Sequence, residues 1–153
     1  MINPTEIEKE IKASMRKCQS FAKREYGINK KCKLTLSTAR DARSFGGSSG
    51  IRLYPLRHLN KESSWCWNGE KWIWREYKLI EDMAAIGRFE TTDWKLIIRA
   101  LVAHEFAHFI QGVLYHQGNK RMRKSHGEGW RDVYADLRWL LVNRELRSEQ
   151  QAA

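Results

Sequence analysis

The run His104-Glu105-Phe106-Ala107-His108 carries two imidazoles and a carboxylate in the HExxH spacing. Residues four apart on an α-helix lie about 6 Å apart along the axis and about 40° apart around it, so both imidazoles can reach one metal ion. Zinc is the expected occupant, because nitrogen ligands in a tetrahedral site with one open position suit this ion. Glu105 can then accept a proton from water at the open position. The motif therefore predicts a catalytic zinc site.

A five-residue match also occurs by chance, and the competing interpretation is a pair of structural histidines on a core helix. The flanking residues are apolar, from Ile97 to Val102 and again at Phe109 and Ile110. Two histidines and a glutamate buried there without a purpose would be costly. The apolar surroundings therefore favour the metal site over simple packing.

Three further histidines and one glutamate compete for the role of third ligand. His116 lies about 12 Å beyond His108 along the same helix, out of reach of a shared ion. Nothing in the sequence directs His58 toward the motif. His126 follows a polar loop and opens the next helix, so a chain reversal can return it to His108. We therefore expect His126 to be the third zinc ligand, with Glu128 as the alternative.

Other groups near the motif could assist the chemistry. A tetrahedral oxyanion needs a further donor, for which Tyr115, Tyr134 and Arg131 are the candidates. Asp132 or Asp136 could hold a ligand histidine through its second ring nitrogen. The alternative for both aspartates is a solvated position on a helix surface.

The first third of the chain predicts one helix and two strands. Residues 4–26 have apolar side chains at helical spacing, acids early and bases late, and Gly27 is the expected C-cap. Residues 33–37 alternate like a half-buried strand. A Gly/Ser turn over 46–50 then leads into a second strand at 51–54.

The remaining elements are a hairpin and two helices. In residues 64–78 Asn68-Gly69 is a turn signal, so Trp65 and Trp67 should pair with Trp72 and Trp74 across two strands. These tryptophans are expected to pack a small sheet, with stacking on bases as the alternative.

The first of these helices starts at Thr92 or Asp93 and runs to Gly118, and the last spans 127–146, with a basic loop at 119–125 between them. This order predicts an α+β fold, with helices over a small sheet.

Composition and charge limit the function classes. The chain has 153 residues, 42% of them hydrophobic, with seven Trp, which indicates one globular domain over 1–153. No stretch approaches the ~18 consecutive apolar residues of a membrane span, and the N-terminus lacks a secretory signal. Three cysteines without a CxxC pair argue against a disulfide framework. We therefore expect a cytoplasmic protein that is not secreted.

The net charge of +10 is unevenly distributed. Residues 1–59 carry 13 bases and 5 acids, and a second basic cluster comprises Lys120, Arg121, Arg123 and Lys124. Such asymmetry indicates a surface for polyanions, so we expect non-specific DNA, including single strands, as a partner. A basic protein without a nucleic-acid role is the alternative.

HEFAH, followed after seventeen residues by His126-Gly127-Glu128-Gly129-Trp130, resembles the SprT-like (Spartan-type) zinc metalloprotease domain. The run Gly50-Ile51-Arg52-Leu53-Tyr54-Pro55 is similar to a strand of the same domain. The resemblance implies a minimal zincin-like fold over roughly 5–145. It also implies His104, His108 and His126 as zinc ligands, Glu105 as general base, and DNA-associated proteins as substrates. The chain differs from many family members in its Trp-rich segment and in carrying no C-terminal zinc ribbon.

Three hypotheses follow. The first is a zinc metallopeptidase that acts on DNA-associated proteins and would give a nucleoid-associated or nuclear location. The second is a nucleic-acid-binding module with a structural zinc site. The third is a non-catalytic interaction protein with a core histidine pair. Glu105 favours the first, because a structural zinc site has no need of a carboxylate beside an open position.

Overall fold

The computed structural model describes residues 2–40 and 42–152 and has a mixed α+β architecture. Its helices are α1 (Pro4–Tyr26), α2 (Trp94–His116), α3 (Glu128–Arg138) and α4 (Arg144–Ala152), with a π-helical segment at Trp139–Asn143 and 3-10 turns at Pro55–Arg57 and Lys120–Met122. Its strands are β1 (Lys33–Leu36), β2 (Phe45–Gly47), β3 (Gly50–Leu53), β4 (Trp72–Trp74) and β5 (Phe89–Thr91). The predicted α+β class is confirmed.

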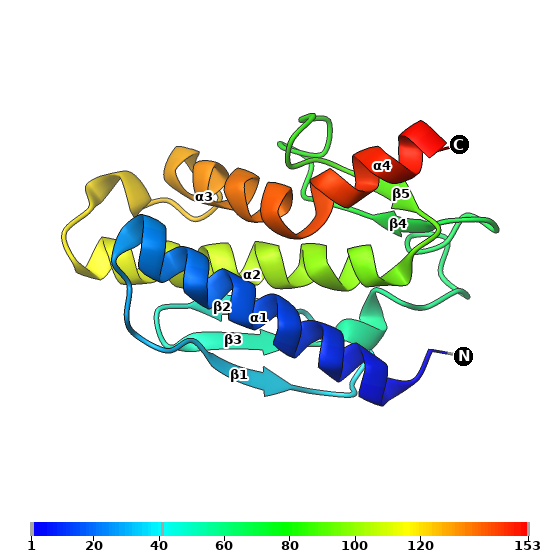
Figure 1. Ribbon diagram of the computed structural model, residues 1–153, viewed down its shortest axis with the longest axis horizontal. Helices are drawn as coiled ribbons and strands as arrows, with labels where there is room; N and C mark the ends of the chain where they lie inside the picture. Colours follow the sequence, from blue (N-terminus) through cyan, green and yellow to red (C-terminus); the bar gives the residue numbers. More distant parts are fainter. Residues whose placement is uncertain (1, 41, 153) are drawn as a thin grey trace.

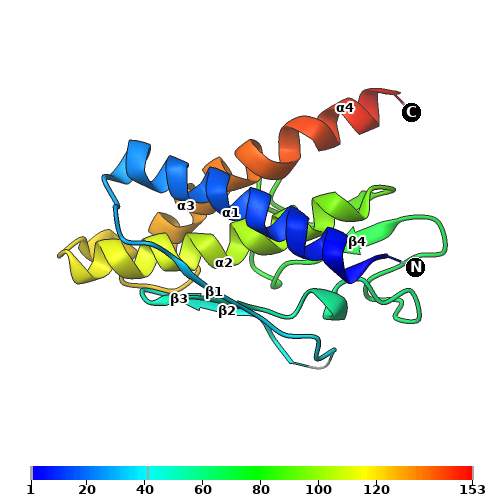
Figure 2. The ribbon, with the colours of Figure 1, turned by 60° about the horizontal axis from the view of Figure 1, so that its bottom comes forward.

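Helix α2 is the centre of the molecule. Figure 2 shows the sheet of β1, β2 and β3 on one side of α2, and α1, α3 and α4 on the other. Asp93 caps its N-terminus by accepting a hydrogen bond from the Lys95 amide. The helix is long and apolar enough to cross a membrane, yet most of it is buried within the protein. Burial on several sides explains why its apolar residues do not form a single stripe.

Helix α1 follows the prediction in its bounds and in its C-cap. Its N-cap residue Asn3 accepts a hydrogen bond from the Thr5 amide, and Gly27 ends the helix in the left-handed conformation at φ 66°. Ile7, Ile11 and Cys18 are buried against the core. This helix lies across α2 (Figure 1).

The three-stranded sheet has the order β1-β3-β2, in which β1 runs parallel and β2 antiparallel to β3. The sequence predicted β1 and β3 but assigned Gly46 and Gly47 to a turn, whereas both belong to β2. A side chain at Gly46 would overlap the backbone carbonyl of Glu105, and one at Gly112 would come within 2.8 Å of the Ser48 nitrogen. Glycine on each element therefore lets β2 and α2 pack backbone to backbone.

The predicted Trp hairpin is wrong in its pairing. The Asn68-Gly69 turn forms, but only an isolated bridge joins Trp67 to Trp72. The first arm is coiled, because the amides of Cys66 and Trp67 both donate to the Ser63 carbonyl. Strand β4 pairs instead with β5, a strand that the sequence analysis did not predict. The packing role of the tryptophans is confirmed for the two in β4, which are buried, whereas Trp65 is exposed.

The final helical region is longer than predicted and is interrupted. It runs as α3, the π-helical segment and α4, so it extends six residues beyond the expected end at 146. At the two ends of the π-helical segment, Arg138 donates through Nε to the Asn143 side chain, and the Asn143 side chain donates to the Ala85 carbonyl. These bonds tie the helical region to the loop before β5.

Candidate metal centre

Helix α2 and the segment just before α3 supply the three histidines of the site. His104 and His108 lie one turn apart on α2, and their ring centroids are 5.2 Å apart. The chain reverses after His116, first through Gly118 at φ 96° and then through the 3-10 turn at Lys120–Met122. His126 thereby returns to the motif, with its ring 4.6 Å from that of His108. The predicted trio of His104, His108 and His126 is brought together.

The ring nitrogens of the three histidines point toward one another. Nε2 of His126 lies 2.9 Å from Nε2 of His108 and 3.3 Å from Nε2 of His104. All three ligand atoms lie within 4.8 Å of one another. Ligand atoms 2.0–2.1 Å from a tetrahedral ion are about 3.3 Å apart, so the spacing fits an ion such as zinc.

The hydrogen bond on the other nitrogen of His108 fixes its tautomer. Nδ1 of His108 lies 3.2 Å from Oε1 of Gln111. The amide nitrogen of Gln111 is identified by its two acceptors, the carbonyls of Met122 and Lys124. Since Oε1 can only accept, Nδ1 of His108 carries the proton and Nε2 presents a lone pair to the centre.

The carboxylate of Glu76 lies beside the other ring nitrogen of His104. Nδ1 of His104 lies 3.2 Å from Oε2 of Glu76, whose side chain is fully buried. A carboxylate accepts, so Nδ1 of His104 carries the proton and Nε2 again presents a lone pair. The Nε2 atoms of His104 and His108 thus converge with that of His126 on one point, as the ligands of a bound metal ion do. The donor set therefore fits a metal ion.

Glu76 is the buried centre of a polar network around His104. It accepts hydrogen bonds from the indole of Trp74 at 2.6 Å and from the hydroxyl of Tyr134, and Arg138 lies 3.9 Å away. Burial lowers the pKa of His104, but the hydrogen bond and charge of Glu76 outweigh it and raise this pKa overall. A more basic imidazole is a stronger metal ligand.

Backbone geometry sets His126 apart from its neighbours. Among the described residues it is the one non-glycine with a positive φ, 59°. Its carbonyl accepts two hydrogen bonds, from the hydroxyl of Tyr77 at 3.0 Å and from Nε of Arg131 at 3.0 Å. A non-glycine residue in this region is strained by about 1–3 kcal/mol and persists because its surroundings hold it. The conformation that directs His126 at the centre therefore lowers the stability of the fold by a small amount.

The indole of Trp130 packs against all three histidines. Its ring centroid lies 4.9 Å from His104, 5.0 Å from His108 and 4.6 Å from His126, and Trp130 is fully buried. Burial, with a smaller contribution from His104, lowers the pKa of His108 to about 3 and that of His126 to about 4. Both imidazoles are neutral near pH 7, as metal ligands must be.

Glu105 lies beside the histidines and lines an adjoining cavity. The cavity has a volume of about 320 Å³ and is also lined by His104, His126, Tyr77 and His58. Glu105 is 6% exposed, and burial raises its pKa although His104 partly opposes the shift. A carboxylate of raised pKa at an accessible site is suited to accepting and returning a proton.

Two alternatives for the third ligand lie elsewhere. His116 is exposed at the C-terminal end of α2, and Glu128 is exposed in the first turn of α3. Neither belongs to the cluster of ligand atoms that the described residues form. His58, in contrast, lies closer to the site than the sequence indicated, since it lines the cavity between Trp65 and Trp74.

The predicted supporting residues have other roles. Asp132 is exposed and paired with Arg121, and Asp136 is exposed, so neither holds a ligand histidine. Of the three oxyanion candidates, Tyr115 is exposed, Tyr134 donates to Glu76, and Arg131 donates to the His126 carbonyl; none of them lines the cavity.

The sequence analysis missed Glu76, Gln111 and Tyr77. Gln111 had a usable signal, because it lies three residues after His108 on the same helix face. Glu76 and Tyr77 had none, since the irregular segment that carries them reaches the site only through tertiary packing.

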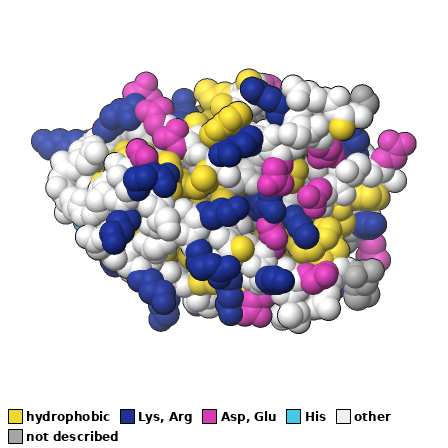
Figure 3. Space-filling model, in the orientation of Figure 1, with side chains coloured by type: hydrophobic (Ala, Val, Ile, Leu, Met, Phe, Trp, Pro, Cys, Tyr) yellow, Lys and Arg dark blue, Asp and Glu magenta, His cyan; other side chains and the backbone are white. Residues whose placement is uncertain are grey.

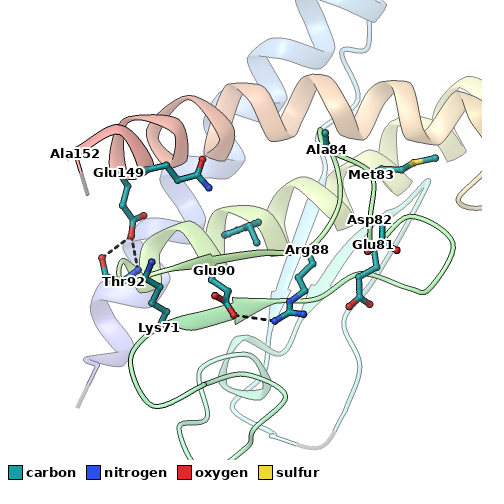
Figure 4. Close-up of a pocket in the computed structure, with 12 residues that line it drawn as sticks. Lys71, Glu81, Asp82, Met83, Ala84, Arg88, Glu90, Thr92, Glu149 and Ala152 are labelled. Carbon is teal, nitrogen blue, oxygen red and sulfur yellow. Dashed lines mark hydrogen bonds and ion pairs between the residues drawn. The ribbon is translucent and has the colours of Figure 1, made fainter.

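A larger cavity, about 900 Å³, lies away from the histidines, between the segment before α2 and the C-terminal helix (Figure 4). Several of its polar side chains already have partners within the protein. Glu149 accepts hydrogen bonds from the amide and hydroxyl of Thr92, and Arg88 pairs with Glu90. The described residues that line it include no histidine or cysteine. The chemistry of the molecule is therefore concentrated at the smaller cavity.

Comparison of the chain with models of known protein families, with curated proteins and with solved structures found no match.

Proposed function

We propose that this protein is a zinc-dependent peptidase with His104, His108 and His126 as metal ligands and Glu105 as general base. The observation that carries the proposal is the position of Glu105, which lines the same cavity as two of the three histidines. A structural zinc site usually has four protein ligands, whereas the cluster among the described residues has three. Three ligands leave one position for water or substrate.

A zinc ion held there would act as a Lewis acid on the scissile carbonyl and lower the pKa of water to about 7. Glu105 accepts the proton of the attacking water and returns it to the leaving amine. Glu76 and Gln111 hold the rings of His104 and His108 by their Nδ1 protons throughout. Tyr77 and Arg131 hold the backbone of His126.

The exposed edge of the sheet supports a peptide as the substrate. β2 is the last strand in the order β1-β3-β2, and Gly46 within it lies against Glu105. An extended peptide that paired with this edge would run beside the general base. The geometry thus favours a chain-like substrate in extended conformation over a compact small molecule.

The proposal includes the zincin-like fold and the SprT-like relationship, and with them DNA-associated proteins as substrates. Support for DNA comes from the surface. The exposed bases of α1 outnumber its exposed acids; they are Lys9, Lys12, Arg16, Lys17, Lys23 and Arg24. Lys and Arg are spread over the face that carries α1, with acidic side chains between them (Figure 3). Affinity for single-stranded DNA should fall steeply as salt rises, and an affinity independent of salt would contradict this part of the proposal.

The peptidase is tested with the zinc-loaded protein and its Glu105→Gln variant on a library of synthetic peptides, with products read by mass spectrometry. The wild type should cleave, and the variant should retain zinc while its rate falls by about 10²–10⁴-fold. Exposed Glu128→Gln is the matched control and should cleave normally. Equal cleavage by wild type and Glu105→Gln would contradict the assigned role, and no cleavage by the zinc-loaded wild type would favour a binding module.

A further inference from the structure

A groove lies between helix α1 and strand β1. It has a volume of about 660 Å³, and the residues that line it come from the middle of α1, from β1 and from the segment before β1: Lys12, Met15, Arg16, Lys31, Cys32, Lys33 and Leu34. None of the described residues lines both this groove and the cavity beside Glu105. The groove is therefore a second feature of the surface, separate from the metal centre.

Strand β1 forms one wall of the groove and is an edge strand, with β3 as its neighbour in the sheet (Figure 1). The Ser37 amide donates to the Leu53 carbonyl of β3 at 3.0 Å. Successive residues of a strand direct their backbone groups to opposite sides, so those of Leu34 and Leu36 point to the free edge. Within the described part of the chain, no hydrogen bond reaches these groups. The edge of β1 is therefore open to a further strand.

Just before this edge, the side chain of Gln19 on α1 takes the place of a neighbouring strand. Its nitrogen donates to the Lys30 carbonyl at 2.9 Å, and its oxygen accepts from the Cys32 amide at 2.9 Å. One residue of a parallel neighbouring strand would make the same pair of bonds. The next groups along the edge are the Cys32 carbonyl and the Leu34 amide, which have no such partner among the described residues. Gln19 thus begins a backbone pairing that nothing in the described chain continues.

The rim of the groove is cationic. Arg16 on α1 and Lys31 and Lys33 on the opposite side are exposed, and none of the three forms an ion pair with a described residue. Lys12 pairs with Glu8 at 3.0 Å, so its charge is already compensated. The described residues that line the groove include no acid. Three cations without a counter-charge favour an anionic occupant.

The floor of the groove is apolar. Met15 and Leu34 are half-buried against the core, and Cys32 is buried. The described lining contains no aromatic ring, so it lacks the stacking platform on which single-stranded nucleic acids bind. A polypeptide, in contrast, carries the regularly spaced N–H and C=O groups that an open strand edge can pair with. The groove therefore suits a peptide better than a nucleic acid.

We propose that the groove binds an extended acidic segment of a partner protein, which adds to the free edge of β1 as a further strand. The backbone of the segment pairs with the Cys32 carbonyl and the Leu34 amide. Because side chains alternate along a strand, acidic residues meet the cationic rim while the apolar residues between them pack on Met15. The inference goes beyond the proposed peptidase and does not depend on the metal centre.

The probe is a fluorescein-labelled peptide in which Glu and Val alternate, and its matched control replaces every Glu by Gln. Binding is measured by fluorescence anisotropy on the Glu105→Gln variant, in which cleavage should be suppressed. We expect the Glu peptide to bind about 10- to 100-fold more tightly than the Gln peptide, as expected for one charge-assisted contact. Equal affinities, or no binding of the Glu peptide, would overturn the proposal.

The added strand has a readout of its own in amide hydrogen exchange followed by NMR. Exchange of the Leu34 amide should slow about tenfold or more when the Glu peptide is bound, because this amide gains an acceptor. The Thr35 amide points toward β3 and should change much less. Binding of the peptide with unchanged exchange at Leu34 would overturn the strand pairing.

Arg16→Glu is the informative variant, because Arg16 is exposed and its replacement removes no buried contact. It should abolish the preference for the Glu peptide while its thermal unfolding matches that of the parent protein. Lys78→Glu makes the same change of charge at an exposed position outside the described lining and should keep the preference. A preference that survives Arg16→Glu would overturn the role of the cationic rim.

Two further outcomes separate this proposal from the others. An oligothymidine that binds more tightly than the Glu peptide, and loses its affinity in Arg16→Glu, would assign the groove to nucleic acid and overturn the peptide. Preferred binding of the Glu peptide by a protein that, in its zinc-loaded wild-type form, cleaves no peptide would support the groove and count against the peptidase alone.

Discussion

The Glu76 carboxylate lies 3.2 Å from Nδ1 of His104, and the two residues reach each other from the segment after β4 and from α2. Among the described residues neither atom makes a regular hydrogen bond, so this close contact is the one polar contact that each of them has. The contact fixes which nitrogen of His104 faces the centre, so a residue outside the motif prepares the motif for metal.

Glu76→Gln should weaken zinc binding by about 10- to 100-fold, because the ligand loses its charged acceptor. The measurement is competition with a chromophoric chelator. Glu90→Gln is the matched control, since Glu90 lies on β5 and is paired with Arg88 rather than with a ligand. Unchanged affinity in Glu76→Gln would show that Glu76 serves only the fold.

Gly46→Ala should destabilise the protein by about 1–3 kcal/mol, because its methyl group would overlap the Glu105 carbonyl and lie 3.2 Å from Cβ of His108. The change should also displace the general base and lower activity. Gly47→Ala on the same strand meets nothing within 4 Å and should be nearly neutral in chemical denaturation. Similar effects of the two substitutions would contradict the close packing of β2 on α2.

The elements that carry local signals could be predicted from the sequence. Helix α1 is marked by its apolar spacing and its capping glycine Gly27, and α2 by its many apolar residues and its N-cap residue Asp93. The turn at 68–69 is marked by the Asn-Gly dipeptide. The failures lie where tertiary contacts decide. The Trp65 arm coils around Ser63 instead of pairing, and β4 takes its partner from residues 89–91.

In the site, the spacing of His104 and His108 on a helix predicted them as ligands of one ion. His126 was predicted as the third ligand because the other histidines were excluded. The distance between two residues on one helix follows from their separation in the sequence. No such rule predicts that Glu76 reaches His104 or that His58 reaches the cavity, because both lie in irregular segments whose direction depends on packing against α2.

Tyr77→Phe should loosen His126, because it removes one of the two hydrogen bonds to the carbonyl of this positive-φ residue. We expect a loss of about 1 kcal/mol in the free energy of unfolding and a severalfold weaker zinc affinity. Tyr115→Phe is the control, as Tyr115 is exposed on α2. A variant that binds zinc as tightly as the wild type would mean that Arg131 alone is sufficient.

Stability should depend on pH through His58. Burial, with smaller contributions from the charges of Arg57 and His104, lowers the pKa of His58 from 6.5 to about 3. Between these values the unfolded chain binds a proton that the folded chain does not, so stability is full above pH 6.5 and is lost as pH falls toward 3. The free energy of unfolding should decrease by about 1 kcal/mol per pH unit in this window.

The contribution of His58 is isolated by comparison with His58→Gln, measured by denaturation in the presence of a chelator. The difference between wild type and variant should shift steadily between pH 6.5 and 4, in favour of the variant at low pH. A constant difference would show that His58 does not remain neutral in the folded protein.

The most direct measurement of the central claim is the zinc content of the purified protein by elemental analysis, beside His126→Ala and His116→Ala. The account predicts about one zinc per chain in the wild type and in His116→Ala, whose histidine is exposed at the end of α2. It predicts a large loss of zinc in His126→Ala. Absence of zinc from the zinc-supplemented wild type, or equal zinc in all three proteins, would contradict the site formed by His104, His108 and His126.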